Sequence, residues 1–256
     1  HATLHSFPTR RSSDLEDGAY FAYARRYGEV LERNDIELEI HPTSGSVENY
    51  NLLRDENSTV DFAFVQGGTG NAAEAPDLVS LGSMYYEPVW VFHRSRVRIE
   101  RLTQLKGRRL AIGPAGSGTR HLVTQLLAAN GVPIPQGERA DLAGEAAVKA
   151  LNEGRVDVVI LVASSRSKAV NTLLRDRRVQ LASFSYAEAY TRHFPHLHAI
   201  VLPKGGIDLK LNIPPRDVHL IATTANLVAR NDLHPAIAGL LAEAASEIHG
   251  APGLFQ

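Results

Sequence analysis

The chain has 256 residues, of which 44% are hydrophobic and 21% are charged, a balance that is ordinary for a globular protein and leaves room for two modest lobes. Its 27 Lys and Arg residues are matched by 28 Asp and Glu residues, so no overall basic charge favours nucleic-acid binding. The absence of cysteine excludes disulfides, thiolate metal sites and a cysteine nucleophile, and no run of about 18 apolar residues predicts a membrane-spanning helix.

The two ends of the chain lack the patterns of the rest. Residues 1–15, HATLHSFPTRRSSDL, show neither a helix or strand period nor a signal-peptide pattern. Because FPTRRSSDL is similar to a translated sequencing adapter, we expect residues 1–15 to be a non-native or disordered tail. The sequence stops at HGAPGLFQ, directly after a helix pattern, and we expect the chain to be a fragment at both ends.

The first third of the chain alternates helices with strands, and its strands end in small polar loops. Thr43–Ser46 follow one strand and lead into a helix, and Gln66–Gly70 follow the next strand. A loop that feeds a helix N-terminus offers unpaired N–H donors to an anion. The expected elements are a helix over Tyr20–Leu31, a strand over Ile36–Ile40, a helix from Val47, a strand over Val60–Val65, and two short strands over Leu78–Met84 and Pro88–Phe92.

The stretch Leu105–Leu127 carries the strongest site signal, because a strand over Arg109–Ile112 runs through the glycine-rich loop Gly113–Thr119 into an amphipathic helix. The loop has neither the lysine of a P-loop nor the spacing of a dinucleotide fingerprint. Arg120 would add a fork of donors suited to a carboxylate or phosphate. The alternative is a tight strand-to-helix turn with an ordinary N-cap.

The remainder of the chain continues the alternation. The expected helices cover Gly144–Asn152, Ser167–Leu174, Ala187–His193 and His234–His249, and the expected strands cover Val156–Val162, Val179–Phe184, His198–Leu202 and His219–Thr223. This order predicts an α/β fold with mainly parallel sheets flanked by helices. Polar loops follow strands in both halves of the chain, which favours two lobes facing one cleft.

An ordered set of motifs resembles the TAXI family, the periplasmic solute-binding subunits of TRAP transporters. The set comprises GAY (18–20), PTSGSVEN (42–49), VDFAFVQGG (60–68), LGSMYYEPVWVFHR (81–94), LKGRRLAIGPAGSGTR (105–120), LNEGRVDVVILV (151–162) and the closing helix. The resemblance implies a two-lobed type II periplasmic-binding-protein fold, with one lobe built from 16–92 and 206–256 and the other from 93–205. It also implies that the first strand of the family is missing here, replaced by the tail. Some relatives continue into a hydrophobic C-terminal membrane anchor.

The candidate ligand-binding residues come from the polar loops and their flanking aromatics. For Ser44, Ser46 and the residues around Ser117, the alternative role is capping of the local helix. Tyr20 and Tyr86 would wall the pocket. The histidines 193, 196 and 198 do not form a metal-binding pattern, so no metal is expected. The full candidate set is Tyr20, Ser44, Ser46, Asn49, Gln66, Tyr86, Gly116, Ser117, Gly118, Thr119 and Arg120.

The expected function is that of a non-enzymatic receptor without a cofactor, a periplasmic monomer that binds a small anionic solute and delivers it to TRAP membrane permease subunits. The solute would be a glutamate-like amino acid or a dicarboxylate, anchored by Arg120. One alternative is a transferase that binds a phosphorylated substrate at the GSGT loop, with Asp61 or Asp157 as base. Another is the effector-sensing domain of a transcription regulator. Residues 175–178 (RDRR) are a solvated helix end or a docking patch for a membrane partner.

Overall fold

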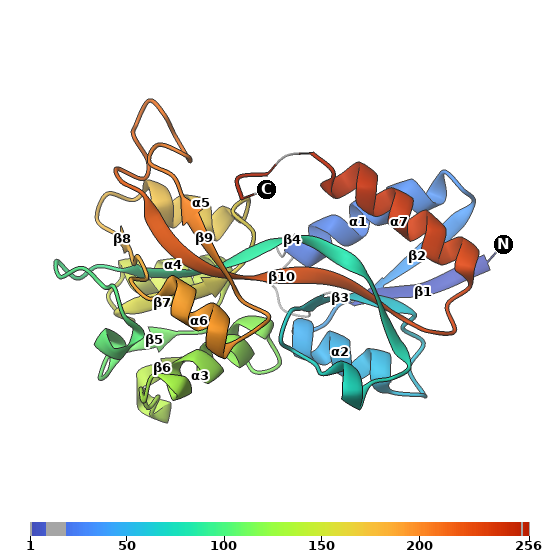
Figure 1. The fold of residues 1–256 in the computed structure, drawn as a ribbon, viewed down its shortest axis with the longest axis horizontal. Helices are drawn as coiled ribbons and strands as arrows, with labels where there is room; N and C mark the ends of the chain where they lie inside the picture. Colours follow the sequence, from blue (N-terminus) through green and yellow to red (C-terminus); the bar gives the residue numbers. More distant parts are fainter. Residues whose placement is uncertain (1, 9–18, 252, 256) are drawn as a thin grey trace.

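Two lobes lie side by side and are joined by two long strands (Figure 1). The computed structural model describes residues 2–8, 19–251 and 253–255. The connecting strands are β4 (Leu78–His93) and β10 (Val218–Arg230), which pair with each other antiparallel along most of their length. The change of lobe therefore occurs within a continuous sheet.

The main sheet has the strand order β3-β10-β4-β7-β5-β6, with β8 added on β4 and β9 on β10. Every antiparallel ladder described involves β4 or β10, while β5 pairs parallel with both β6 and β7. The sheet is therefore mixed and not mainly parallel, because the two connecting strands run against their neighbours. The remaining strands are β2 (Ile36–His41), β3 (Phe62–Gln66), β5 (Leu110–Ala111), β6 (Arg139–Ala140), β7 (Val158–Val162), β8 (Gln180–Leu181) and β9 (His198–Leu202).

Helices cover the sheets of each lobe. In one lobe α1 (Ala19–Glu32) and α7 (Pro235–His249) lie next to each other and bury Tyr27 and Leu241 in a core with Phe62 and Phe64. In the other lobe Trp90 and Phe92 of β4 join a larger core with the helices of that half. The other helices are α2 (Ser46–Arg54), α3 (Gly118–Ala129), α4 (Gly144–Asn152), α5 (Lys168–Arg175) and α6 (Ala187–His193), and short 3₁₀ turns cover Ala72–Glu74, Leu102–Leu105 and Gln136–Glu138.

The core clusters and ladders indicate where the chain changes lobe. Val89 in β4 already belongs to the core of the second lobe, and Ile221 in β10 still does. These positions differ from the boundaries at 92/93 and 205/206 expected from the sequence. We propose crossings at Glu87 and Thr223, which face each other in the ladder. Below, lobe I denotes the described residues of 2–86 and 224–249, and lobe II denotes residues 88–222.

Residues 2–8, which were expected to belong to a disordered or non-native tail, form a strand. This strand, β1 (Ala2–Pro8), pairs parallel with β2, Leu4 facing Leu38, and lies beside β3. An extended segment can pair here because an unpaired strand edge presents a row of free N–H and C=O groups. The expectations that these residues have no secondary structure and that lobe I lacks a first strand are therefore wrong for Ala2–Pro8. Residues 9–15 of the expected tail lie outside the described residues, and the non-native origin of the segment stays a prediction.

Candidate functional site

A cavity of about 180 Å³ lies between the two lobes, where five helices begin. Lobe I contributes the first turns of α1 and α2 together with Gln66 at the end of β3, and Glu87 lies at the crossing. Lobe II contributes the first turns of α3, α4 and α5 and the end of β7. Four of these helices begin here because β2, β5, β6 and β7 each end in a short loop that leads into the next helix.

Three of these helix starts have no side-chain cap. The N-cap residues of α2 and α4 are Gly45 and Ala143, which have no side-chain oxygen, and Ser167 before α5 makes no capping hydrogen bond within the described part of the chain. The first N–H groups of a helix have no partner inside the helix and carry partial positive charge. Donors from both lobes therefore face one cavity, an arrangement suited to an anionic group.

The cavity also holds a buried acid, Glu87. Its Oε2 accepts a hydrogen bond of 2.9 Å from the hydroxyl of Tyr20, whose ring stacks on Phe64. Burial raises the pKa of the Glu87 carboxyl to about 8, and the bond from Tyr20 opposes that rise. At neutral pH Glu87 is therefore mostly protonated and can either donate or accept a hydrogen bond. Burial and the proximity of Glu87 raise the pKa of Tyr20 well above its usual value, so Tyr20 remains a donor.

A second acid, Glu145, faces the cavity from the first turn of α4. Its Oε1 is buried and has no hydrogen-bond partner among the described residues. Lys168, at the start of α5, is exposed at the rim. The site thus combines backbone donors for an anion with two carboxyl groups that can accept from a cation.

Seven of the eleven predicted residues line the cavity. They are Tyr20, Ser44, Ser46, Gln66, Ser117, Gly118 and Thr119. Several of their hydroxyls form hydrogen bonds to other residues of the chain. Ser117 caps α3 by accepting from the N–H of Arg120, and Ser46 accepts from the N–H of Gln66. The Ser44 hydroxyl donates to the carboxylate of Glu48. Of these three serines only Ser117 forms a capping hydrogen bond, because α2 has Gly45 at its N-cap and no side-chain cap. The role of all three serines in ligand binding stays a prediction.

The other four predicted residues do not line the cavity. Asn49 is fully buried and links Thr43 to the carbonyl of Phe64. Tyr86 packs edge-on against His198. Gly116 lies at the seam between the lobes, with φ of +81°. Arg120 forms an ion pair with Asp141, and its side chain is only 14% exposed. The guanidinium therefore already has an anionic partner in this arrangement, and its role as carboxylate anchor stays a prediction.

Direct contacts close the lobes over the cavity. The N–H of Val47 donates to the carbonyl of Gly116 at 3.2 Å, and the side-chain amide of Gln66 donates to the carbonyl of Gly118 at 3.1 Å. A third bond of 3.2 Å joins His121 Nε2 to the carbonyl of Gly68. Each bond joins lobe I to the first turn of α3 or to the loop that precedes it in lobe II. The structure therefore has the closed arrangement of the two lobes.

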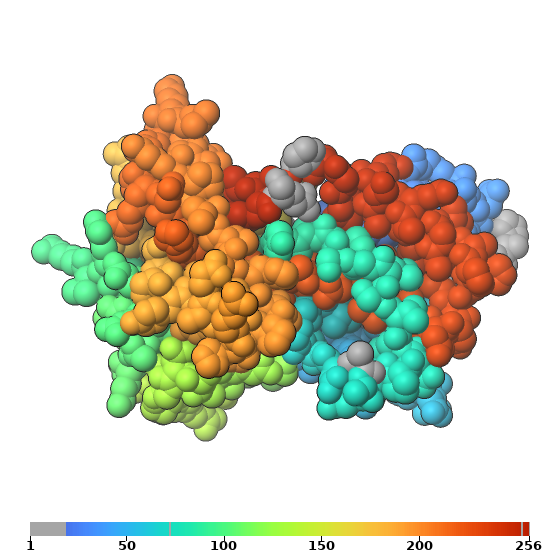
Figure 2. All heavy atoms as spheres, in the orientation of Figure 1, coloured from blue at the N-terminus to red at the C-terminus, as the bar shows by residue number. Residues whose placement is uncertain are grey.

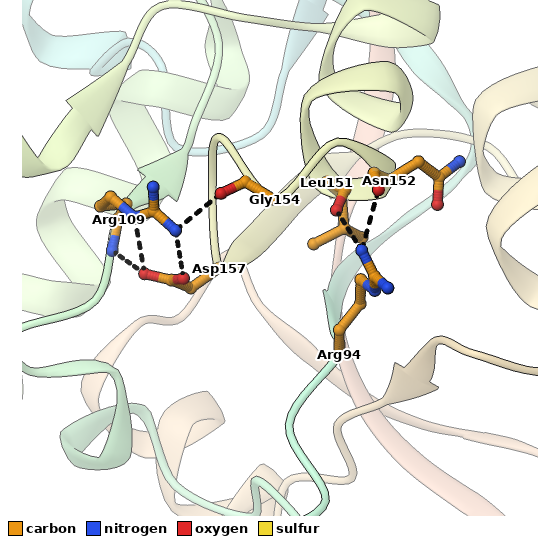
Figure 3. Close-up of polar contacts among 6 residues, drawn as sticks. All are labelled: Arg94, Arg109, Leu151, Asn152, Gly154 and Asp157. Atoms are coloured by element: carbon orange, nitrogen blue, oxygen red, sulfur yellow. Dashed lines mark hydrogen bonds and ion pairs between the residues drawn. The ribbon is translucent and has the colours of Figure 1, made fainter.

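The candidate bases of the enzyme alternative are not arranged for catalysis. Asp157 forms a two-point ion pair with Arg109, which also donates to the carbonyl of Gly154 (Figure 3). Neither Asp157 nor Asp61 lines the cavity. No group of three or more His, Asp or Glu residues that could hold a metal ion lies in the described ranges.

Sequence reasoning missed several parts of the site, among them Glu87, Ala143–Glu145, Leu161–Ala163 and Ser167–Ala169. A signal existed for Glu87, because a charged residue between a tyrosine pair and the apolar run PVWVF is unusual in a buried strand. The starts of α4 and α5 were predicted as helix starts but not as site residues, because nothing local in the sequence shows that they meet the loops of lobe I.

Comparison with known proteins identifies the fold. No curated protein sequence matches the chain. The arginine-specific periplasmic binding protein STM4351 of Salmonella typhimurium is 13% identical, with a TM-score of 0.52 over 99% of this chain and 96% of that chain. MatC of Rhodopseudomonas palustris, solved with malate, is 16% identical, with a TM-score of 0.57 over 96% of this chain and 84% of that chain. The effector binding domain of QuiR, solved with shikimate, is 12% identical, with a TM-score of 0.57 over 98% of each chain.

At such identities these likenesses show the fold alone, which is the type II periplasmic-binding-protein fold expected from the sequence. None of the helices in the described part of the chain is long and apolar enough to cross a bilayer. A model of the NMT1-like family matches residues 16–247, and the chain therefore belongs to the NMT1-like family.

Proposed function

We propose that this protein is the extracytoplasmic receptor of a TAXI-type TRAP transporter, which binds a small carboxylate-bearing solute and delivers it to membrane permease subunits. The observation that carries the proposal is the cavity between the lobes, onto which three uncapped helix starts open. Membership of the NMT1-like family and the periplasmic binding proteins among its structural neighbours support it.

The solute binds by stabilising the closed arrangement. It contacts the starts of α2 and α4 at the same time only when the lobes are closed, so its differential contact energy shifts the population toward that form. Binding needs no chemical step, and the protein acts as a receptor and not as an enzyme.

The cavity favours an amino acid over a dicarboxylate. The helix starts would hold a carboxylate, and Glu87 and Glu145 would accept from an ammonium group. A dicarboxylate offers no ammonium donor to the free Glu145 oxygen, which would then stay unpaired in a buried site. A glutamate-like amino acid satisfies both parts of the site.

A thermal-shift screen with amino acids, dicarboxylates, sugar acids and nucleotides, followed by calorimetry on each hit, tests this proposal. A ligand at about 100 times its Kd adds about 2.7 kcal/mol of stability, which is readily detected. If an amino acid binds with its ammonium group at Glu87, the pKa of Glu87 falls on binding, so affinity rises as pH increases toward 8. A dicarboxylate would show the opposite slope. Binding only of phosphorylated compounds, or chemical turnover of the bound compound, would contradict the receptor proposal.

A second candidate is the effector-sensing domain of a transcription regulator, favoured by the fold shared with the effector binding domain of QuiR. The two candidates differ in what precedes the lobes in the natural gene product. Determining that N-terminal region distinguishes them, since a secretion signal supports the receptor and a helix-turn-helix supports the regulator.

A further inference from the structure

The near-zero net charge of the chain hides an opposite charge on each lobe. Residues 88–222, which form lobe II, contain 20 of the 27 Lys and Arg residues and only 10 of the 28 Asp and Glu residues. The rest of the chain contains the other 7 basic and 18 acidic residues. Lobe II therefore presents a positive field that the total charge does not reveal.

Much of this positive charge gathers in three neighbouring segments of lobe II, which we call the basic face. Asn152 links two of them, because its backbone carbonyl accepts from Arg94 at 2.8 Å (Figure 3) and its side-chain Oδ1 accepts from Arg178. An ion pair of 2.8 Å between Arg175 and Asp208 links the third. The segments are 94–101, 175–178 and 204–216, with ten Lys or Arg and three Asp or Glu residues in total.

Two of the segments are loops that project from lobe II and are held by internal contacts. In the first, Ile99 is buried and the side chain of Gln104 bonds three backbone groups of residues 98–101. In the second, backbone bonds join Gly205 to Pro214 and Ile207 to Ile213. These contacts fix the loop conformations, so the residues at the tips are exposed by the fold itself.

The tips of both loops are apolar. Leu209 is 88% exposed, Val97 is 65% exposed and Leu211 is 52% exposed. In Figure 2 the second loop forms the orange finger at the top of the view and the first forms the green arm at the left. The exposed side chains of Arg96, Arg98 and Lys210 flank these tips. Exposure of such projecting apolar side chains to water is unfavourable in free energy, and it becomes favourable to bury them when a partner covers the tips.

We propose that the basic face binds the surface of an anionic lipid bilayer, with Val97, Leu209 and Leu211 entering the headgroup region. A bilayer is negatively charged at its surface and apolar beneath, so it matches cations that surround projecting apolar tips. A nucleic acid would attract the same cations but would offer no apolar layer to the leucines. This inference does not depend on the identity of the solute or on the proposed transport function.

Co-sedimentation with phosphatidylcholine vesicles, prepared with and without phosphatidylglycerol, tests the proposal on the unmodified chain. We expect binding only to the vesicles that contain phosphatidylglycerol, and we expect it to weaken as salt is raised. A parallel titration of the protein with a duplex oligonucleotide measures binding to an anionic polymer that has no apolar layer. It therefore reports the contribution of the cations without that of the apolar tips.

Two variants separate the contributions of charge and apolar contact. Arg96→Ser/Arg98→Ser should lower the vesicle partition coefficient roughly tenfold or more, since each cation near the surface contributes about fivefold. Leu209→Ser/Leu211→Ser should lower vesicle binding several-fold and leave oligonucleotide binding unchanged. Arg54→Ser/Arg192→Ser removes the same charge outside the basic face and serves as the matched control. All of these side chains are exposed, and thermal melts verify that each variant is folded.

The proposal is overturned if the unmodified chain does not bind phosphatidylglycerol vesicles, or if the control variant loses as much binding as Arg96→Ser/Arg98→Ser. It is also overturned if the leucine variant binds vesicles as well as the unmodified chain, because the apolar tips would then have no part in binding.

Discussion

Glu87 is buried, lies at the crossing between the lobes and accepts a hydrogen bond from Tyr20. Its pKa is raised to about 8 in the folded chain, so between its ordinary pKa and pH 8 the folded state holds a proton that the unfolded state releases. Stability therefore falls as pH rises through this window. The same group that can interact with a solute thus makes the ligand-free protein less stable at alkaline pH.

We predict that Glu87→Gln removes this pH dependence, because the amide keeps the shape and the bond to Tyr20 but cannot ionise. Relative to the unmodified chain, the variant should gain stability on the order of a few kcal/mol at pH 8 and change little near pH 5. Urea denaturation at a series of pH values measures the difference. Equal slopes of stability against pH in both proteins would show that Glu87 is not the titrating group.

Gly116 is the second residue whose substitution has a clear expected result. Its φ of +81° is unfavourable for other residues, and a Cβ there would meet the side chain of Ser44 in the other lobe. Because the contact with Ser44 arises when the lobes are closed, Gly116→Ala should hold the lobes apart and weaken solute binding by roughly tenfold or more, equivalent to about 1.4 kcal/mol. Small-angle scattering measures the opening, and calorimetry measures the affinity.

Gly131→Ala is the matched control for Gly116→Ala. Gly131 also has a positive φ, of +63°, but nothing lies within 4 Å of its Cβ position, and it follows α3 away from the seam. If both variants weaken binding equally, backbone strain and not contact between the lobes explains the effect.

At the scale of elements, the C-terminal end of α7 carries a half-buried histidine. His249 packs against the rings of Tyr23, Tyr27, Tyr85 and Phe64, and burial lowers its pKa to about 4. In the unfolded chain its pKa would be near 6.5, so as pH falls from 6.5 to 4 the unfolded state binds a proton that the folded state excludes. The free energy of unfolding therefore falls as pH decreases from 6.5 to 4 because of this histidine in α7.

We predict that His249→Phe stabilises the protein at pH 5 by on the order of 1 kcal/mol and has a smaller effect at pH 7. The phenyl ring preserves the aromatic contacts and removes a ring nitrogen that has no partner among the described residues. Thermal melts across this pH range provide the measurement. Destabilisation at both pH values would mean that the imidazole makes a favourable contact that phenylalanine cannot replace.

The bounds of helices and strands were predicted correctly where the whole segment packs against the core of one lobe, so that its hydrophobic pattern is uniform. The bounds of α4, α6 and β9 agree with the sequence-based ranges, because each lies within a single lobe. The prediction failed for β4 and β10, which pass from one core to the other. In β4 the polar stretch Tyr85–Glu87 separates two apolar runs, so the pattern predicted two short strands where there is one.

The site was predictable only as far as local patterns reach. The sequences of the loops at Ser44 and Ser117 predict helix starts, and both serines line the cavity. The partner of Arg120 could not be predicted, because Asp141 follows β6, and only the pairing of β6 with β5 brings that segment near the start of α3. The position of Glu87 between the lobes likewise depends on the long ladder between β4 and β10.

At the scale of the whole molecule, the closed arrangement depends on few direct bonds. His121 forms one of them with Gly68 and does not line the cavity, so its effect on binding can act only through closure. We predict that His121→Phe raises the radius of gyration of the ligand-free protein and weakens solute affinity several-fold, the loss expected for one hydrogen bond. Small-angle scattering and calorimetry provide the two readouts.

His193→Phe, on α6, is the control for this prediction, since His193 is exposed and takes no part in the contacts between the lobes. If His121→Phe leaves both the radius of gyration and the affinity unchanged, the bond to Gly68 does not contribute to closure.

The paired strands at the crossing also determine how the two halves can move. Thr223 faces Glu87 and Ala222 faces Pro88 in a regular ladder, and the register shifts lie further along, beyond Ala225 in lobe I. The hydrogen bonds of such a two-stranded ribbon resist stretching of the strands and sliding of one strand along the other. The ribbon can still bend and twist. We therefore expect the lobes to open by bending and twisting of this ribbon and not by sliding of one lobe past the other.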